Sequence, residues 1–378
     1  MIFCIEILFS KLEFDLLTMR FISTNDIEAW ANMVDCKYHL PHLIRKLILA
    51  TINNVDIKNI NFPYGEDVQT GGYDGELSSE SGNMFVPLGE SVWEFGTTNN
   101  KKGKADEDYN KRKEEPLDKI PEETTYININ AKKYRDKTKW TKEKKEDGFW
   151  KDVRYIDAID IEQWLELAPY VELWLAEVLK KPTLGIYTAD EYWKIWSESS
   201  EVKIVPEILL GKSRKDQIAR IIKFLKEPEN ILYIKSVTTD EAVAFPLAAL
   251  MSIDEISRDN IVVIDNMESF IRFSKTSQPL IIIAKFKFET IEIKDAIQRG
   301  HKIIVPISLA DEVHSAPILE LPIVSRISFE ESLEKMGIGS EQARMLTSNS
   351  GRNISVLKRL LGLDLNTKPN LNISIVLK

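Results

Sequence analysis

Hydrophobic and polar residues alternate along the first half of the chain with periods that predict both helices and strands. Apolar residues recur at helical spacing over 40–52, which predicts a helix that packs on a core. Alternating segments follow at 73–79, 91–98 and 124–131, and each is typical of a half-buried strand. The segment 153–179 begins as a strand and continues as an amphipathic helix rich in Trp and Leu. This order of elements predicts an α/β sandwich.

Short apolar runs alternate with helical patterns in the second half, from about residue 206 to residue 325. The apolar runs cover 230–235, 260–265, 279–286 and 301–307, and the helical patterns cover 240–251, 267–275 and 293–300. Continuous apolar strands between helices predict a parallel sheet that is covered on both faces. Beyond residue 325 the pattern is helical throughout, which predicts a small lid-like helical subdomain.

These patterns divide the chain into five parts. They are an N-terminal extension (1–18), a first α/β domain (19–180), a connector (181–205), a second α/β domain (206–325) and the helical subdomain (326–378). The extension is apolar, but it lacks a basic leader and is interrupted by charged residues. We therefore interpret it as neither a secretion signal nor a membrane span, and we expect no membrane partner.

The composition of the 378 residues, 43% hydrophobic and 29% charged, is that of an ordinary globular protein. The net charge of -9 argues against a wholly basic nucleic-acid coat protein. Binding to nucleic acid is still compatible with this charge, because it depends on where positive residues cluster. The two cysteines, Cys4 and Cys36, form no disulfide framework or metal motif, which favours a reducing, cytoplasmic setting.

Two carboxylates and a lysine form the first candidate for catalytic chemistry. Asp74 and Glu94 fall in neighbouring alternating segments, and Lys104 begins a charged helical stretch in which Asp108 and Arg112 share its face. Hydrolysis of a phosphodiester by a metal ion needs oxygen ligands, an activated water and nearby positive charge. We expect Asp74 and Glu94 to bind Mg²⁺ (or Mn²⁺), and Lys104 to orient the water or neutralise the phosphate.

An ordinary structural interpretation of the same residues stays open. Asp74 would be a turn aspartate, Glu94 a half-exposed strand residue and Lys104 a solvated side chain. Three further residues are weaker candidates for the site, namely Glu66, Gln69 and Glu80.

The order of elements and the two acids on the second and third strands resemble the PD-(D/E)XK restriction-endonuclease superfamily. A longer run of segments, VQTGGYDG, VPLGESVWEFGTT, GKADEDYNKR and KTKWTKEKKEDGFWKDVRYIDAIDIEQWLE, resembles the N-terminal module of large prokaryotic antiphage-defence proteins. The resemblance implies a metal-dependent DNA endonuclease, or a catalytically inactive nuclease fold that binds DNA or a partner. The superfamily pattern has a lysine two residues after the glutamate, where this chain has Gly96.

A basic stretch follows the third predicted strand. Ten Lys and Arg residues stand against five Asp and Glu between Lys132 and Arg154, with Trp140 and Trp150 interleaved. Cations along phosphates supply sequence-independent affinity for DNA, and aromatic rings can stack beside them. The candidate DNA-backbone contacts are Lys132, Lys133, Arg135, Lys137, Lys139 and Lys142. The alternative is a solvated loop whose tryptophans anchor it, which we favour for Trp150.

The second α/β domain resembles the core of AAA+ or STAND-type NTPases, which the antiphage-defence resemblance also implies. Asp265 ends a strand where a Walker B acid would lie, and Arg352 lies in the lid-like helices. A phosphate loop GxxxxGK[ST] should follow the first strand, but this chain has Asp240 and Glu241 there, which would repel a triphosphate. We expect a degenerate scaffold that hydrolyses no nucleotide. Its helical end, with Lys358 and Arg359, would contact a second copy or further defence-system domains.

Overall fold

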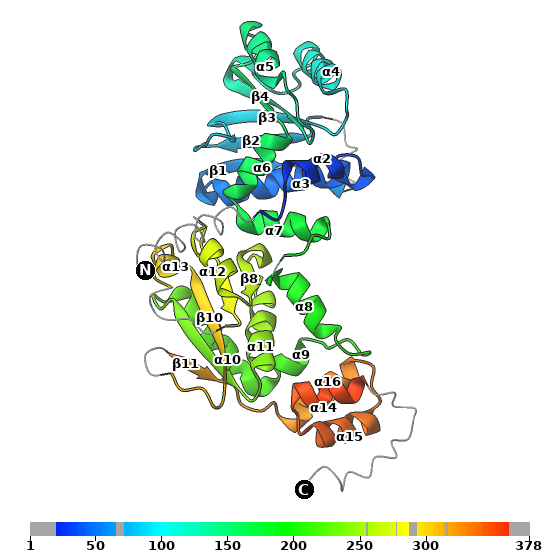
Figure 1. Cartoon of the computed structure of the whole chain (residues 1–378), viewed down its shortest axis with the longest axis vertical. Coiled ribbons are helices and arrows are strands. Elements are labelled where there is room, and N and C mark those ends of the chain that lie inside the picture. The colour runs from blue at the N-terminus through cyan, green and yellow to red at the C-terminus, as the bar shows by residue number, and fades with distance from the viewer. Residues whose placement is uncertain are drawn as a thin grey trace, which may run out of the picture. The chain divides into compact units, whose positions relative to one another are not determined.

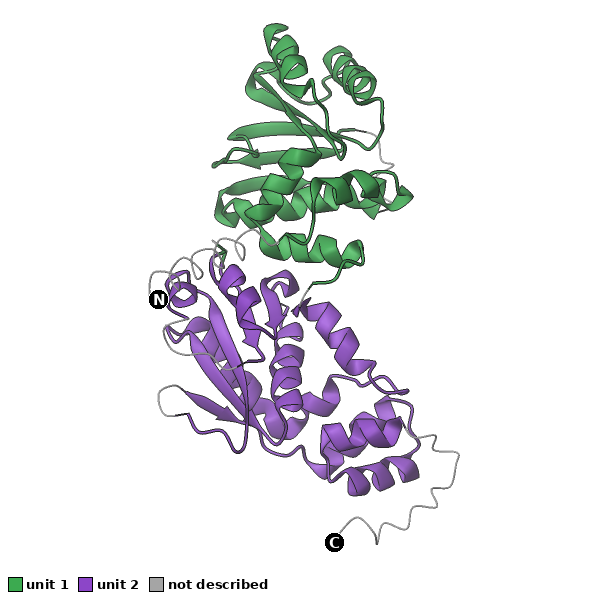
Figure 2. Cartoon of the chain, viewed as in Figure 1, with its two compact units in different colours: residues 1–183, 276–278 green, residues 184–275, 279–378 purple. Residues whose placement is uncertain are grey.

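The computed structural model describes residues 20–65, 72–183, 185–254, 256–276, 278–286, 293–313 and 317–362. The predicted extension 1–18 lies outside these residues. The chain forms two compact units, which we call unit 1 (residues 1–183 and 276–278) and unit 2 (residues 184–275 and 279–378), coloured separately in Figure 2. Both units combine helices with a β-sheet, so the predicted α/β class is confirmed.

Unit 1 is built on a five-stranded mixed sheet (Figure 1). Its strands lie in chain order: β1 (Ile57–Asn61), β2 (Gly75–Ser79), β3 (Gly89–Gly96), β4 (Thr124–Asn130) and β5 (Asp152–Ile156). Strand β2 runs antiparallel to both of its neighbours, β1 and β3, whereas β3, β4 and β5 run parallel to one another. The strand that carries Glu94 is therefore the central one.

Helices cover both faces of this sheet. They are α2 (Thr24–Trp30), α3 (Val34–Thr51), α4 (Lys101–Glu114), α5 (Lys137–Glu146), α6 (Ala158–Glu166) and α7 (Pro169–Val178). Helices α4 and α5 pack Tyr109 and Trp140 on one face, against Val92 of β3 and Tyr126 of β4. Successive strand residues point to opposite faces, so Glu94 shares the face of Val92, while Trp93 points to the other face.

Most predicted elements of unit 1 are present, with corrections at their ends. A capping box of Ser23 and Asp26 starts α2. Helix α3 begins six residues before the predicted start and contains Pro41. The helix predicted to continue through 153–179 is two helices, because Pro169 starts a new one at its first turn.

Two elements of unit 1, β1 and α5, were not predicted. Strand β1 exposes three of its five residues, so it has no apolar alternation to detect. Helix α5 buries a single residue, Trp140, and is otherwise polar and charged. Helical periodicity is read from apolar positions, and α5 offers too few of them.

Gly75, the first residue of β2, lies directly under the ring of Phe62. A Cβ atom at position 75 would approach the Phe62 ring to 2.4 Å, which is closer than any real contact of this kind. Phe62 is itself buried and packs edge-on against Trp93, at 5.6 Å between ring centroids. The strand can therefore pass beneath this aromatic pair only because residue 75 has no side chain.

Unit 2 is built on a six-stranded sheet. Its strands are β6 (Ile186–Thr188), β7 (Ile231–Ser236), β8 (Ile261–Ile264), β9 (Ile281–Ala284), β10 (Lys302–Ser308) and β11 (Ile318–Glu320), and their spatial order is β11-β7-β10-β9-β8-β6. All neighbouring strands are parallel except β6, which runs antiparallel to β8 at one edge. The prediction of a wholly parallel sheet is therefore wrong at this edge strand.

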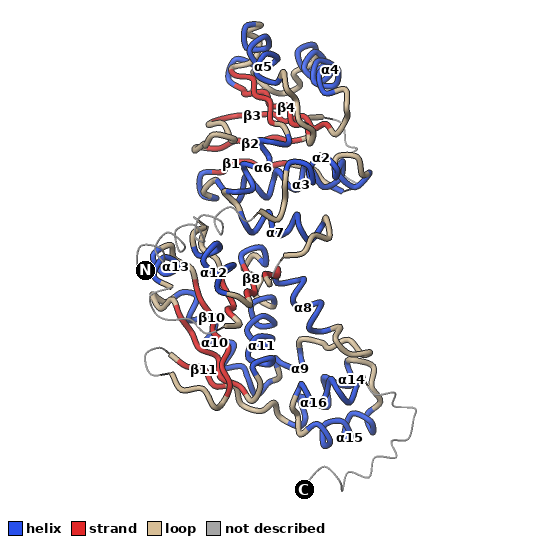
Figure 3. Tube along the Cα trace, in the orientation of Figure 1, coloured by secondary structure: helices blue, strands red, loops and turns tan. Residues whose placement is uncertain are grey.

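The helices of unit 2 surround this sheet and extend beyond one end of it (Figure 3). They are α8 (Ala189–Ser197), α9 (Glu207–Leu210), α10 (Lys215–Lys226), α11 (Thr239–Met251), α12 (Met267–Ser274), α13 (Lys294–Gln298), α14 (Arg326–Lys335), α15 (Ser340–Ser350) and α16 (Ile354–Leu361). Helix α11 buries ten residues and contacts both β7 and β10. It is the central helix of the unit.

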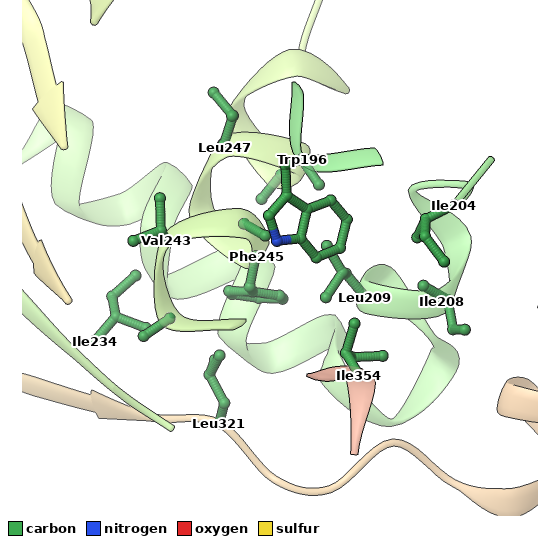
Figure 4. Close-up of a cluster of buried hydrophobic side chains, with 14 of the residues drawn as sticks. Trp196, Ile204, Ile208, Leu209, Ile234, Val243, Phe245, Leu247, Leu321 and Ile354 are labelled. Atoms are coloured by element: carbon green, nitrogen blue, oxygen red, sulfur yellow. The ribbon is translucent and has the colours of Figure 1, made fainter. Parts of the chain in front are cut away.

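One hydrophobic core joins the sheet, the predicted connector and the helical subdomain (Figure 4). Trp196 of α8, Phe245 of α11 and Ile354 of α16 are all buried members of this core. Residues 181–205, predicted as a connector, thus contribute β6 and α8 to unit 2. Helices α14 to α16 belong to the same compact unit as the sheet.

Candidate active site

Asp74 lies at the residue before β2 and faces a cavity of unit 1. Its Oδ2 atom accepts a hydrogen bond of 2.8 Å from the backbone N–H of Phe95, which ties the start of β2 to the end of β3. The cavity has a volume of about 590 Å³ and lies between Leu40 and Pro41 of α3, the end of β3, and Lys104 of α4. The predicted acid and the predicted lysine therefore line one cavity.

Glu94 lies behind this cavity in a buried ion pair. Only 5% of the residue is exposed, and its Oε1 atom accepts from the Nε atom of Arg112 on α4. The Arg112 guanidinium also donates to the carbonyl of Gly72 and lies 4.5 Å from the centroid of the Tyr73 ring. Arg112 thus joins α4 to the central strand and to the chain just before Asp74.

The two predicted carboxylates interact electrostatically. Burial raises the pKa of Glu94 to about 8, and the charge of Asp74 acts in the same direction, although Arg112 opposes both. A carboxylate that is buried beside a like charge is harder to ionise, even with one cationic partner. Burial and the charge of Asp74 therefore oppose the ionisation of Glu94, and the Arg112 guanidinium favours it.

Asp108 is a third carboxylate at this place, and no role beyond a shared helix face was expected for it. Its Oδ1 atom accepts a 2.6 Å hydrogen bond from Lys104, and its Oδ2 atom is buried with no hydrogen-bond partner among the described residues. Burial raises the pKa of Asp108, and the charge of Asp74 acts in the same direction. Its spacing from Lys104 and Arg112 was the available signal.

Gly96 stands where the superfamily pattern has a lysine. A Cβ atom at this position would lie 2.9 Å from Nδ2 of Asn130, so a side chain here would require the Asn130 amide to shift. Both Gly96 and Lys104 line the cavity. The cation near the acids therefore comes from the following helix.

The donor set of the site consists of carboxylate oxygens, which are the ligands that Mg²⁺ and Mn²⁺ prefer. In the conformation of the described residues, no group of three or more His, Cys, Asp and Glu side chains is arranged to hold a metal ion. The unsatisfied Oδ2 atom of Asp108 is nevertheless an acceptor in need of a cation or donor. These oxygen donors are of the kind that binds Mg²⁺ or Mn²⁺. In this conformation Lys104 pairs with Asp108 and Arg112 pairs with Glu94.

The weaker candidates do not join the cavity. Glu66 and Gln69 lie outside the described residues. Glu80 forms an exposed ion pair of 2.7 Å with Lys58 and is not among the residues that line the cavity.

Half of the predicted DNA-contacting cations have partners inside unit 1. Lys132 is buried and donates to the side chain of Asn32, and Lys133 donates to Asn25 at 2.8 Å. Lys137 forms ion pairs with two carboxylates of the β5–α6 region, including Asp157 at 2.8 Å. These three lysines stabilise the fold locally.

The other predicted cations are exposed. Lys139 and Lys142 are 79% and 77% exposed on α5, and each lies nearly 4 Å from a glutamate one turn later. Arg135, just before α5, is also exposed. Trp140 and Trp150 are buried, so the anchoring role favoured for Trp150 is confirmed and neither ring is available for stacking on bases.

The turn between β7 and α11 in unit 2 is occupied by its own charges. Glu241 is buried, and it accepts hydrogen bonds of 2.6 Å from both Arg214 and Ser236. Thr238 caps α11 by accepting from the backbone N–H of Glu241. Asp240 accepts from the indole of Trp196. The predicted acids thus take part in the internal packing of this turn.

Three other residues singled out from the sequence also have structural partners: Asp265 in the second α/β domain, and Arg352 and Lys358 in the helical subdomain. Asp265 follows β8, and its backbone N–H donates to Gly185 at 2.9 Å. Arg352 of the α15–α16 turn donates to the carbonyl of Val324 at 3.2 Å. Lys358 of α16 lies 3.7 Å from the ring centroid of Trp196. It therefore packs inside unit 2.

Comparison with known proteins adds no relative to these observations. No family model matches the chain, and no curated protein or solved structure matches it. Among the helices that the structure describes, none combines the length and the apolar character needed to cross a bilayer.

Proposed function

We propose that unit 1 is a DNA endonuclease module that depends on Mg²⁺ or Mn²⁺, and that unit 2 is an NTPase-like scaffold that hydrolyses no nucleotide. The observation that supports the nuclease most directly is the electrostatic coupling of Asp74 and Glu94 beside a cavity that Lys104 also lines. The sheet order of unit 1, with its acids at the second and third strands, agrees with the PD-(D/E)XK resemblance.

In this proposal the side chains divide the chemistry of phosphodiester hydrolysis. A bound divalent ion supplies charge neutralisation and an activated water. Asp74 and Glu94 provide oxygen ligands, and the Lys104 ammonium orients the water or neutralises the phosphate. Gly96 leaves the floor of the cavity open at the end of β3.

The rival function is a non-catalytic DNA-binding or assembly protein on the same fold. A specific observation favours it, because Arg112 already neutralises Glu94, which does not line the cavity. An internal guanidinium in this position would make a metal ion unnecessary for the stability of the fold. The two functions differ in what happens to DNA rather than in whether DNA binds.

Plasmid cleavage by the purified chain distinguishes the two functions. We expect nicking with Mg²⁺ or Mn²⁺, and binding without cleavage when Ca²⁺ replaces them. Asp74→Asn and Glu94→Gln should each abolish cleavage, whereas Glu80→Gln, which alters an exposed acid outside the cavity, should not. Wild-type protein that binds DNA but leaves it intact with every metal would favour the rival function.

The role in antiphage defence rests on the resemblance alone. Phage should form fewer plaques on cells that carry the intact gene than on cells that carry Asp74→Asn. Equal plaque numbers across a broad phage panel would remove this part of the proposal while leaving the nuclease untouched.

A further inference from the structure

Helix α4 carries a charged stripe of which Lys104 lines the cavity, and the buried part of this stripe contains an acid, Asp108, that the proposed mechanism does not use. Lys104, Asp108 and Arg112 are spaced by one helical turn each. The Asp108 side chain is only 7% exposed, and its Oδ2 atom has no hydrogen-bond partner among the described residues. A buried carboxylate oxygen without a partner costs free energy, so its persistence needs an explanation.

The positive charge beside Asp108 comes from a side chain that can move. Lys104 is 39% exposed and lines the cavity, while its ammonium reaches back to the Oδ1 atom of Asp108 at 2.6 Å. Arg112, by contrast, is almost fully buried and holds Glu94. A lysine on a flexible stem can leave a carboxylate for solvent or for a phosphate far more readily than a buried arginine can.

We infer that Asp108 is a third carboxylate ligand of the metal site, and that the Lys104 ammonium occupies the place at Asp108 that a divalent cation takes. The inference rests on the proposed function, because it extends the same site. Asp108 supplies the free Oδ2 atom, and Asp74 supplies a carboxylate on the cavity side. Lys104 then competes with a divalent cation for Asp108. Once the cation binds, the Lys104 ammonium becomes available to a phosphate.

Binding of Mn²⁺ to the whole chain, measured by the loss of the free-ion EPR signal, tests this inference without any DNA. Asp108→Asn should weaken Mn²⁺ binding by about tenfold or more. Lys104→Met should strengthen it by about threefold or more, because a competing positive charge is removed. The matched controls lie on the exposed side of the same helix: Glu114→Gln and Lys111→Met should both bind Mn²⁺ like the wild type.

Thermal unfolding supplies a second measurement, which distinguishes a metal ligand at position 108 from a purely structural residue. In EDTA, Asp108→Asn should be about as stable as the wild type, because the change removes a buried carboxylate oxygen without a partner together with a half-exposed ion pair to Lys104. Added Mn²⁺ should then raise the melting temperature of the wild type but not of this variant. If Asp108→Asn does not fold, Asp108→Ser and the Lys104→Met result still test the inference.

Three outcomes would overturn it. If Asp108→Asn binds Mn²⁺ normally while Asp74→Asn does not, Asp108 is no ligand, and the nuclease proposal stands without it. If Lys104→Met binds Mn²⁺ more weakly, Lys104 does not compete with the metal. If the wild type binds no Mn²⁺ at millimolar concentration, both the inference and the proposed function fail.

Discussion

At the scale of single residues, Glu94 is a carboxylate whose ionisation the fold opposes. The pKa is raised to about 8 by burial and by Asp74, against an ordinary value near 4.5. The folded state therefore holds the proton of Glu94 over a pH range in which the unfolded chain has lost it. The stability that this proton provides is present at low pH and is lost as the pH rises through about 8.

We predict that Glu94→Gln removes this dependence on pH. In EDTA, the stability of the wild type relative to Glu94→Gln should fall as the pH rises from about 5 to about 9. Each unit of displaced pKa corresponds to about 1.4 kcal/mol. Chemical unfolding of both proteins at pH 5, 7 and 9 measures the difference. A difference that stays constant over this range would show that Arg112, rather than burial, sets the ionisation of Glu94.

At the residue scale, the sequence allowed the candidate acids to be predicted but not their partners. The two alternating segments form the neighbouring strands β2 and β3, and Asp74, just before β2, interacts electrostatically with Glu94 on β3. The partner of Glu94 was not predictable, because the meeting of Arg112 with the central strand depends on how α4 crosses the sheet. The helical spacing of Lys104, Asp108 and Arg112 was visible, but the burial that leaves an Asp108 oxygen unpartnered was not.

At the scale of elements, the turn from β7 to α11 forms a closed network of hydrogen bonds between its own side chains. Glu241 is buried between Arg214 and Ser236, and the cap of α11 comes from Thr238. The N-terminus of a helix attracts anions, but Asp240 and Glu241 already place negative charge in this first turn. A triphosphate would have to displace a buried ion pair to bind here.

We therefore predict that ATP with Mg²⁺ does not bind this turn. A ligand that binds only the folded state raises the melting temperature, so millimolar ATP should leave it unchanged. Asp265→Asn should also change the melting temperature little, because the backbone of Asp265 rather than its carboxylate bonds Gly185. A saturable shift with ATP that Asp265→Asn abolishes would instead indicate a nucleotide site.

Most elements with a clear apolar pattern were predicted, with the amphipathic helix α10 as an exception, and β1 and α5, which lack such a pattern, were missed. The alternation of β2, β3 and β4, and the apolar runs of unit 2, follow directly from burial of one or both faces. Strand β1 lies at an edge with mostly exposed side chains, and α5 contributes one buried tryptophan. Their formation depends on tertiary contacts that a local pattern does not encode.

At the scale of the whole molecule, a net charge of -9 must be overcome locally if the chain binds DNA. Lys132, Lys133 and Lys137 are bonded within unit 1, which leaves the outer face of α5 as the strongest remaining candidate from the predicted basic stretch. Lys139 and Lys142 project from this face into solvent. Contacts between such lysines and phosphates would be weakened by salt.

We predict that Lys139→Glu combined with Lys142→Glu lowers DNA affinity by about tenfold or more at 0.1 M salt, and makes the affinity less dependent on salt. Fluorescence anisotropy with a labelled duplex measures both quantities. The control is Lys212→Glu with Lys215→Glu, which makes the same change in net charge on exposed residues of unit 2. Equal losses in the two double variants would show that only the total charge matters.

The packing of Phe62 on Gly75 affects how conservation of residue 75 among related sequences would be interpreted. Position 75 excludes every side chain for a reason of space alone, since a Cβ atom there would overlap a buried ring. Substitutions of Gly75 would be selected against even in a descendant that had lost all activity, because they would destabilise the fold. An unchanging Asp-Gly pair at 74 and 75 would then record two separate constraints, and only variation at Asp74 could report the loss of chemistry.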